Sequence, residues 1–174
     1  MIFDPVLADI VITEVFPDPL FDESLNEWVE LYNNGTEAVD VSGWMIGDSS
    51  GMDYILGGLY NGEGTIIPAD GYAIITDDST RVYNNFNVSS SAVRLYVDDA
   101  SIGNGLKNDG ETLYLTDNTN LVWNVTYPAA EKGRSLAIVN GSWRIAEPSL
   151  GYDNEGYVDY TDNSTYCDWQ IELI

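Results

Sequence analysis

Hydrophobic and polar residues alternate along much of this chain with the period of two that is typical of β-strands. The clearest stretch is residues 26–33, where Trp28 and Glu30 fall on one face and Val29 and Leu31 fall on the other. Neither face is purely polar. We therefore expect a strand that is covered on one side and partly covered on the other.

A tight turn is expected directly after this stretch. Asn34-Gly35 favours positive φ at consecutive residues, which two-residue hairpin turns require, and residues 39–46 alternate again. These features predict a β-hairpin between residues 26–33 and residues 39–46, with large aromatic anchors. The hairpin contains no obvious nucleophile, base or phosphate loop, so it favours a sheet that binds or supports over one that catalyses.

The rest of the chain is a series of short apolar runs separated by Gly, Asn, Asp and Pro. No segment shows sustained helical spacing of apolar residues. Asn108-Asp109-Gly110 and Asn140-Gly141 are strong turn signals. Many short strands at short intervals predict an all-β fold, an antiparallel β-sandwich of two packed sheets. The expected further strands are residues 8–16, 54–56, 72–76, 92–97, 111–116, 121–127, 135–139 and 142–145.

Composition supports one folded core. A chain of 174 residues can bury roughly 70 % of its unfolded surface. Hydrophobic residues make up 44 % of the chain and aromatic residues 12 %, which excludes a disordered acidic tail. Cys167 is the only cysteine, so no intrachain disulfide can form. No run approaches the roughly 20 apolar residues that a membrane-spanning helix needs.

The charge balance is strongly acidic. Six basic residues against 29 acidic ones give a net charge of −23, with no basic stripe. Such a chain repels nucleic-acid phosphates and anionic lipid heads, so we expect neither nucleic-acid binding nor direct membrane insertion. Three explanations of the acidity stay open: a high-salt habitat, the solubility of an exported protein, and acidic residues assembled into cation sites.

Catalytic chemistry has little support. The chain has no histidine, which removes histidine-based triads, histidine metal sites and the commonest general base. Cys167 without a histidine cannot form a conventional cysteine-protease pair. Two carboxylates can hydrolyse glycosides, but acids are so abundant here that this signal is unspecific. We therefore expect no enzymatic activity.

Calcium is the one metal that the composition favours, because Ca²⁺ prefers the hard oxygen ligands that Asp and Glu supply. No segment follows the twelve-residue EF-hand spacing, so the acids form a candidate site without a motif. We expect any such site in a loop at one end of the sandwich, and we expect no other cofactor. The calcium candidates are Asp18, Asp22, Glu23, Asp98, Asp99, Asp153 and Glu155.

Several individual residues admit two interpretations. For the three strand glutamates we expect edge or rim residues hydrogen-bonded to loop amides, with perturbed acids or a cation site as the alternative. For the tryptophans we expect core filling, with a carbohydrate-stacking platform as the alternative. Arg134 is expected to pair with an acid and Lys107 to be a solvated charge. The residues concerned are Glu14, Glu27 and Glu30, and Trp28, Trp44, Trp123 and Trp143.

Location is indicated only indirectly. Residues 1–4 lack the basic start and apolar core of a signal peptide, so we expect a domain excised from a larger polypeptide. Several Asn-X-Ser/Thr sequons nevertheless favour an extracellular or cell-surface location. The glycosylation candidates are Asn34, Asn87, Asn124, Asn140 and Asn163.

A set of short motifs follows in order along residues 8–152 of the chain. The motifs are Ile10–Val15, Asn26–Asn33, Val41–Ile46 with Asp48, Thr65–Tyr72, Leu106–Leu115, Arg134–Leu136, Trp143 and Pro148–Gly151. No one motif is diagnostic, but in this order they resemble the lamin tail domain family, although Leu150 replaces a proline expected in the last motif.

The resemblance implies an immunoglobulin-like β-sandwich that acts as an interaction module. Prokaryotic members of the family are usually appended to exported or membrane-attached proteins. The chain has no heptad rod, no CaaX end and no basic patch, so the nuclear role of lamins does not carry over. A prokaryotic cell-surface protein, of bacterial or archaeal type, fits the acidic composition better.

We therefore expect a lamin-tail-like domain at residues 8–152, followed by an acidic, aromatic extension at residues 153–174. The extension is expected to add a strand that covers a sheet edge; the alternatives are the start of a further domain or a strand exchanged with a second molecule. The expected function is non-enzymatic adhesion or assembly through an unidentified partner protein. The alternatives are a carbohydrate-binding module with a polysaccharide partner, and a targeting appendage of an extracellular hydrolase or nuclease.

Overall fold

A computed structural model describes residues 9–59 and 64–158 of the chain. Twelve strands, two short α-helices and one 3-10 helix (η1) are present in these residues. Cys167 and Asn163 lie outside the described residues. In chain order the elements are β1 (Ile10–Phe16), α1 (Glu23–Asn26), β2 (Trp28–Asn33), β3 (Val39–Asp40), β4 (Met45–Gly47), β5 (Met52–Gly57), β6 (Ile66–Ile67), β7 (Tyr72–Thr76), α2 (Val82–Asn85), β8 (Val93–Val97), β9 (Glu111–Thr116), β10 (Leu121–Tyr127), β11 (Ser135–Val139), β12 (Ser142–Ala146) and η1 (Asn154–Tyr157).

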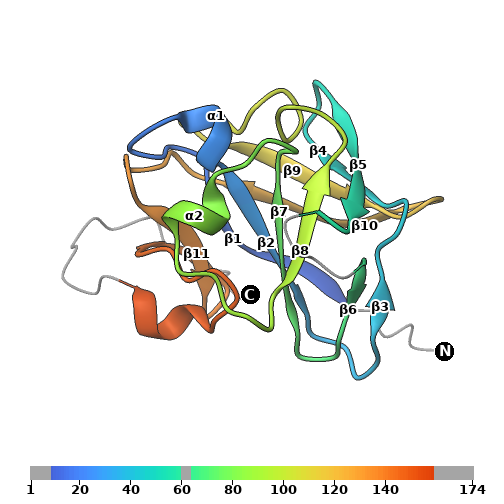
Figure 1. Cartoon of the computed structure of the whole chain (residues 1–174). Coiled ribbons are helices and arrows are strands. Elements are labelled where there is room, and N and C mark those ends of the chain that lie inside the picture. Colours follow the sequence, from blue (N-terminus) through green and yellow to red (C-terminus); the bar gives the residue numbers. More distant parts are fainter. Residues whose placement is uncertain (1–8, 60–63, 159–174) are drawn as a thin grey trace, which may run out of the picture.

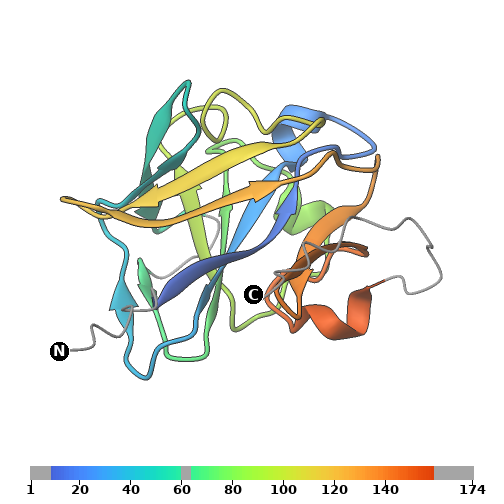
Figure 2. The same cartoon turned by 180° about the vertical axis from the view of Figure 1, so that it is seen from behind.

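The strands form two packed layers, which confirms the expected all-β, immunoglobulin-like sandwich (Figures 1 and 2). One layer runs β12-β11-β1-β2-β7-β8 and the other runs β5-β4-β9-β10. Strand β5 joins them, because residues 52–54 pair with β4 and residues 55–57 pair with β8. Hydrogen bonding therefore continues around this corner of the sandwich, while β3 and β6 form a small separate pair.

The sheets are not purely antiparallel as expected. Strands β7 and β8 run parallel, with Ala73 beside Val93 and Thr76 beside Tyr96. A tight hairpin can join only antiparallel strands, whereas parallel neighbours need a connection that returns the chain to the starting end. Residues 77–92, which include α2, provide that connection.

The hairpin predicted between residues 26–33 and 39–46 is wrong. Strand β2 pairs with β1 on one side and with β7 on the other, so no edge is left for β3, which pairs with β6 instead. Asn34 and Gly35 do not adopt positive φ. The Asn33 side chain shapes the loop in their place, accepting a hydrogen bond from the Gly35 amide (3.0 Å) and donating one to the Ile67 carbonyl (3.0 Å).

Two hairpins do form between neighbouring strands, and one of them contains the turn expected at Asn140-Gly141. Strands β9 and β10 pair directly, and so do β11 and β12. In the second hairpin Asn140 has φ +52° and Gly141 has φ +77°. Positive φ at both central residues is what a turn of this kind requires, so local sequence and structure agree here.

Strand β2 is covered on both faces, more completely than expected. Val29 and Leu31 lie in the main core between the layers, together with residues such as Ile46, Ile55 and Leu115. On the opposite face Trp28 lies in a second core, stacked on Phe16 with ring centroids 5.6 Å apart. The other buried members of this second core are Ile74, Val82, Ala92 and Leu150. The segments around α2 and after β12 therefore provide its cover.

Candidate functional site

Two fully buried carboxylates lie beside the second core. Glu14 of β1 and Glu30 of β2 are cross-strand partners, and neither has any exposed surface. The expectation that they are edge or rim residues is wrong, because β1 and β2 are inner strands and the segment of residues 148–158 covers them. We call that stretch the closing segment.

Backbone amides of the closing segment bind both carboxylates. The Ser149 amide donates to Glu14 (3.2 Å), and the Gly151 amide donates to Glu30 (2.7 Å). Hydroxyl groups complete the set: Ser149 Oγ donates to Glu14 (2.5 Å) and Thr13 Oγ1 to Glu30 (2.8 Å). The expected hydrogen bonds to loop amides are therefore confirmed, in a buried setting.

Burial changes the acidity of the pair. Removal from water raises the pKa of Glu14 to about 7, against the opposing effect of hydrogen bonds from Ser135 and Ser149. Burial, reinforced by the charge of Glu14, raises the pKa of Glu30 well above its ordinary value. Both carboxyl groups therefore hold their protons to a higher pH than exposed glutamates do.

Asn154 fastens the closing segment to the sheet. Its Nδ2 donates to the carbonyl oxygens of Thr13 (3.0 Å) and Ile138 (3.3 Å), and its Oδ1 lies 2.8 Å from Ser149 Oγ. Farther on, Val158 forms a bridge with Ala146 of the edge strand β12. Residue 158 thus lies beside the sheet edge. The edge-covering strand predicted for residues 153–174 stays a prediction, because residues 159–174 lie outside the described residues.

Replacement of Asn154 by alanine is expected to lower the free energy of unfolding by about 2 kcal/mol, because two sheet carbonyls and a buried hydroxyl lose a partner. Urea unfolding at pH 7 measures the change. Asn84→Ala is the matched control, since Asn84 is exposed on α2. Equal costs for the two variants would contradict the anchoring role of Asn154.

A second carboxylate cluster lies around the loop before β9. Lys107 Nζ is 3.3 Å from Asp48 and 3.1 Å from Glu111, and the Tyr127 hydroxyl donates to Glu111 (2.8 Å). The side chains of Asp48 and Glu111 are only 4 % and 6 % exposed, whereas Lys107 is 49 % exposed. Lys107 is exposed to solvent as expected, and it is in addition the counter-ion of two nearly buried acids.

Glu27 lies at the same end of the molecule and is also buried. Its carboxylate accepts a hydrogen bond from the Leu106 amide (3.2 Å). Burial raises the pKa of Glu27 to about 8; the Leu106 hydrogen bond opposes this, and the negative charges of Glu23, Asp77 and Glu111 add to it. With a pKa of about 8, the Glu27 carboxyl group is mostly protonated at neutral pH while it binds the Leu106 amide of the loop before β9.

Replacement of Lys107 by glutamine is expected to lower the free energy of unfolding more than its control does, since it leaves two nearly buried carboxylates without a counter-ion. The effect stays smaller than for a fully buried pair because Lys107 is half exposed. Lys132→Gln is the control: Lys132 is 61 % exposed and lies 3.5 Å from Asp18. We expect it to cost less than about 0.5 kcal/mol in the same urea melts; matching costs would contradict the assigned role.

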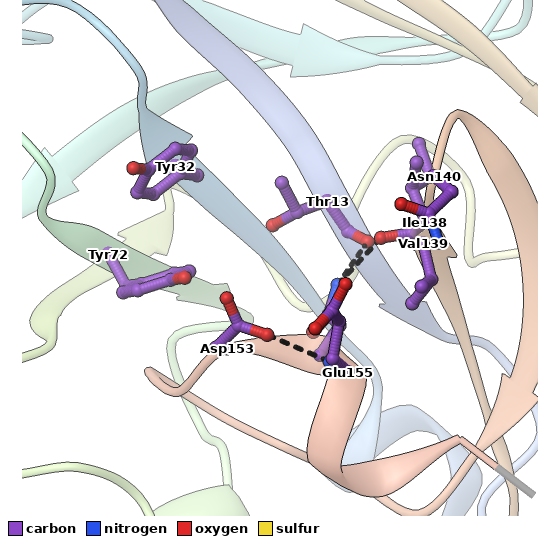
Figure 3. Close-up of a pocket in the computed structure, with 9 residues that line it drawn as sticks. Thr13, Tyr32, Tyr72, Ile138, Val139, Asn140, Asp153 and Glu155 are labelled. Carbon is purple, nitrogen blue, oxygen red and sulfur yellow. Dashed lines mark hydrogen bonds between the residues drawn. The ribbon is translucent and has the colours of Figure 1, made fainter.

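An open hollow of about 250 Å³ lies beside the closing segment (Figure 3). Strands β1, β2 and β7, the β11–β12 hairpin and residues 153–155 all contribute to its wall. Tyr32 and Tyr72 lie on one side, Asp153 and Glu155 form the floor, and Thr13 and Asn140 lie across from the tyrosines. No single motif of the sequence indicated this hollow, because its walls come from five separate segments.

The tryptophans fill the fold as expected. Trp28 is fully buried, and Trp44, Trp123 and Trp143 pack against the main core. Trp143 also donates from Nε1 to the Thr126 carbonyl (2.8 Å). Arg134 pairs with Glu147 (2.8 Å), which confirms its expected acidic partner.

The calcium candidates lie in three separate places: the loop after β1, the loop after β8, and the start of η1. Asp22 pairs with Arg81, and Glu23 accepts a hydrogen bond from Asn108 (2.7 Å). Within residues 9–59 and 64–158, no group of three or more His, Cys, Asp or Glu side chains is arranged to hold a metal ion. Calcium binding at these places stays a prediction. The residues are Asp18, Asp22 and Glu23, then Asp98 and Asp99, then Asp153 and Glu155.

The described glycosylation candidates share one property, exposure to solvent. Glycosylation at these positions stays a prediction. They are Asn34, Asn87, Asn124 and Asn140.

Comparison with known proteins gives one match. The family model described as the lamin tail domain matches residues 5–129, which include β1 to β10 but neither the β11–β12 hairpin nor the closing segment. No curated protein and no solved structure matches the chain. Among the described residues, no helix is long and apolar enough to cross a membrane.

Proposed function

The chain belongs to the lamin tail domain family, a family of immunoglobulin-like interaction and structural modules, and on that premise we propose that it is a non-catalytic adhesion or assembly module of a larger exported or cell-surface protein. The main support for the proposal is the structural role of the buried acids. Glu14, Glu27 and Glu30 are the groups most perturbed toward acid–base chemistry, yet each binds a backbone amide that closes the fold. Their geometry supports a rigid scaffold rather than a reaction centre.

An extracellular location is the second part of the proposal. Its support is the acidic surface, with a net charge of −23, together with the exposure of every described sequon. A strongly charged surface of one sign keeps an exported module soluble and limits contact with nucleic acid. A bacterial or archaeal cell surface is the proposed setting.

Surface labelling tests the location. Intact cells that produce the full-length protein are treated with a membrane-impermeant biotin reagent, and the domain is recovered through an antibody. We expect labelling in intact cells to equal labelling after lysis. Labelling that appears only after lysis would overturn the proposed location.

A competition experiment tests whether the chain acts as a protein-binding module. The chain is cross-linked to its neighbours on intact cells, with and without an excess of free, folded chain. We expect a defined cross-linked protein that the folded chain displaces and a heat-unfolded chain does not. Displacement by a soluble polysaccharide instead would favour the carbohydrate-binding alternative, and a neighbouring hydrolase or nuclease within the same polypeptide would favour the targeting alternative.

A further inference from the structure

We propose that the hollow beside the closing segment binds a basic side chain, arginine or lysine, presented by a partner protein. The inference rests on the proposed function as a protein-binding module and adds a place and a chemistry to it. The argument depends on the aromatic pair, the carboxylates and the distribution of basic residues.

The aromatic pair gives one wall of the hollow a π surface. Tyr32 and Tyr72 are cross-strand partners whose ring centroids lie 4.8 Å apart with an interplanar angle of 35°. The Tyr32 hydroxyl donates to Asp70 (3.1 Å), which fixes the orientation of that ring. A guanidinium or ammonium group is attracted to the face of such a ring within about 6 Å of its centroid.

Carboxylates supply the charge. Asp153 and Glu155 are exposed on the floor of the hollow, below the tyrosine wall, as Figure 3 shows. Asp153 Oδ1 accepts a hydrogen bond from the Glu155 amide (2.9 Å), so the turn that begins η1 positions its carboxylate. Thr13 lines the hollow and also contacts one of the buried acids, because its hydroxyl donates a hydrogen bond to Glu30.

No basic residue of the chain competes for these groups within the hollow. All six lysines and arginines lie in the described residues, and none of them is among the nine residues that line it. Four have acidic partners elsewhere: Arg81, Lys107, Lys132 and Arg134. Burial first, and then the nearby charges of Glu30 and Asp153, raise the pKa of Tyr72 to about 12.

A basic side chain of a partner protein suits the hollow better than this chain's own C-terminal residues do. Residues 159–174 contain Asp159, Asp162, Asp168 and Glu172 and no lysine or arginine, so their charge repels that of the hollow. Calcium fits less well than an organic cation, because Ca²⁺ takes six to eight oxygen ligands and draws nothing from an aromatic wall. The size of the hollow, about 250 Å³, suits one side chain rather than a folded segment.

The test uses the full chain and small probes. N-acetyl-L-arginine amide is titrated into ¹⁵N-labelled protein at pH 7, and N-acetyl-L-citrulline amide, which has the same shape without the charge, is titrated in parallel. We expect the arginine probe to shift the amide signals of Tyr32, Tyr72, Asn140 and residues 151–155 in a saturable manner. The citrulline probe is expected to bind at least about fivefold more weakly, as the loss of a cation–π contact and exposed ion pairs implies.

Matched variants locate the binding. Asp153→Asn with Glu155→Gln removes two charges while keeping an N-cap side chain at position 153, and we expect it to weaken arginine binding about threefold to tenfold. Asp109→Asn with Glu131→Gln removes two exposed charges elsewhere and is expected to leave the affinity unchanged. Thermal melts of both variants confirm that the fold is retained.

Three results would overturn the inference. Equal weakening by the two double variants would mean that the probe samples the acidic surface in general. Saturable binding of N-acetylglucosamine in the hollow, without binding of the arginine probe, would assign it to a sugar. Shifted signals of residues 159–174 in the Asp153→Asn, Glu155→Gln variant would assign it to the chain's own tail. Each of these leaves the cell-surface competition experiment unaffected, so the two proposals fail separately.

Discussion

Raising the pH from 5 to 8.5 is expected to lower the free energy of unfolding by at least about 3 kcal/mol, a strong dependence in a range where most proteins change little. The cause lies in the buried glutamates. Burial raises the pKa of Glu27 to about 8 and that of Glu14 to about 7, from an ordinary value of 4.5.

The direction follows from proton linkage. Below pH 4.5 these glutamates are protonated in both the folded and the unfolded chain, so their contribution to stability is fully present. Between pH 4.5 and about 8 the unfolded chain releases protons that the folded chain still holds, and stability falls as the pH rises through the folded-state pKa values. Each group contributes about 1.4 kcal/mol per pH unit while it differs between the two states.

Glu27→Gln isolates one of these groups. The amide keeps an acceptor for the Leu106 N–H but never ionises, so the variant is expected to match the parent at pH 5 and to exceed its free energy of unfolding by about 2 to 4 kcal/mol at pH 8.5. Urea unfolding across this range in 0.5 M NaCl is the measurement, because salt screens the repulsion among the surface acids. Glu131→Gln is the control for removing one exposed charge. Parallel curves for the parent and Glu27→Gln would contradict the assignment.

Replacement of Trp28 by alanine is expected to cost about 3 to 5 kcal/mol, the range for deleting a large buried aromatic side chain. Trp28 has no exposed surface, stacks on Phe16, and shares the second core with Leu150 of the closing segment. The cavity therefore opens between the sheet and its cover. We expect hydrogen exchange to accelerate first in residues 148–158 and around α2.

Trp28→Phe separates volume from hydrogen bonding. Trp28 Nε1 is buried without a hydrogen-bond partner among the described residues, so the change to phenylalanine removes an unsatisfied donor along with some volume. We expect it to cost less than half as much as the alanine variant. Tyr54→Ala is the surface control, since Tyr54 is 51 % exposed. A Trp28→Ala variant no less stable than Tyr54→Ala would show that the second core contributes little.

Alternation along the chain was enough to predict the strands and the sandwich, because the period of two is a property of each strand alone. The Asn140-Gly141 hairpin was predictable for the same reason, since its backbone conformation depends on two adjacent residues. The resemblance in motif order correctly identified the family, as the match to residues 5–129 confirms.

The same alternating pattern did not predict which distant strands pair with one another. Asn34-Gly35 carries a hairpin signal as strong as Asn140-Gly141, yet β1 and β7 occupy both edges of β2. Competition for a strand edge depends on every strand of the sheet, and the preference of two residues for a turn cannot outweigh the two complete hydrogen-bond ladders that β2 forms with β1 and β7.

The surroundings of the charged residues depend on contacts between residues that are far apart in the sequence. Ser149, which covers Glu14, is 135 positions away in the sequence, and Asp48 is 59 positions from Lys107. The pattern of residues places Glu14 and Glu30 on one face of the sheet, but their burial, their raised pKa values and the hollow beside them depend on where the closing segment packs. A sequence pattern assigns a side chain to one face of a strand. Which segment of the chain covers that face is decided only when the whole sandwich assembles, because the burial of a residue depends on its neighbours in space.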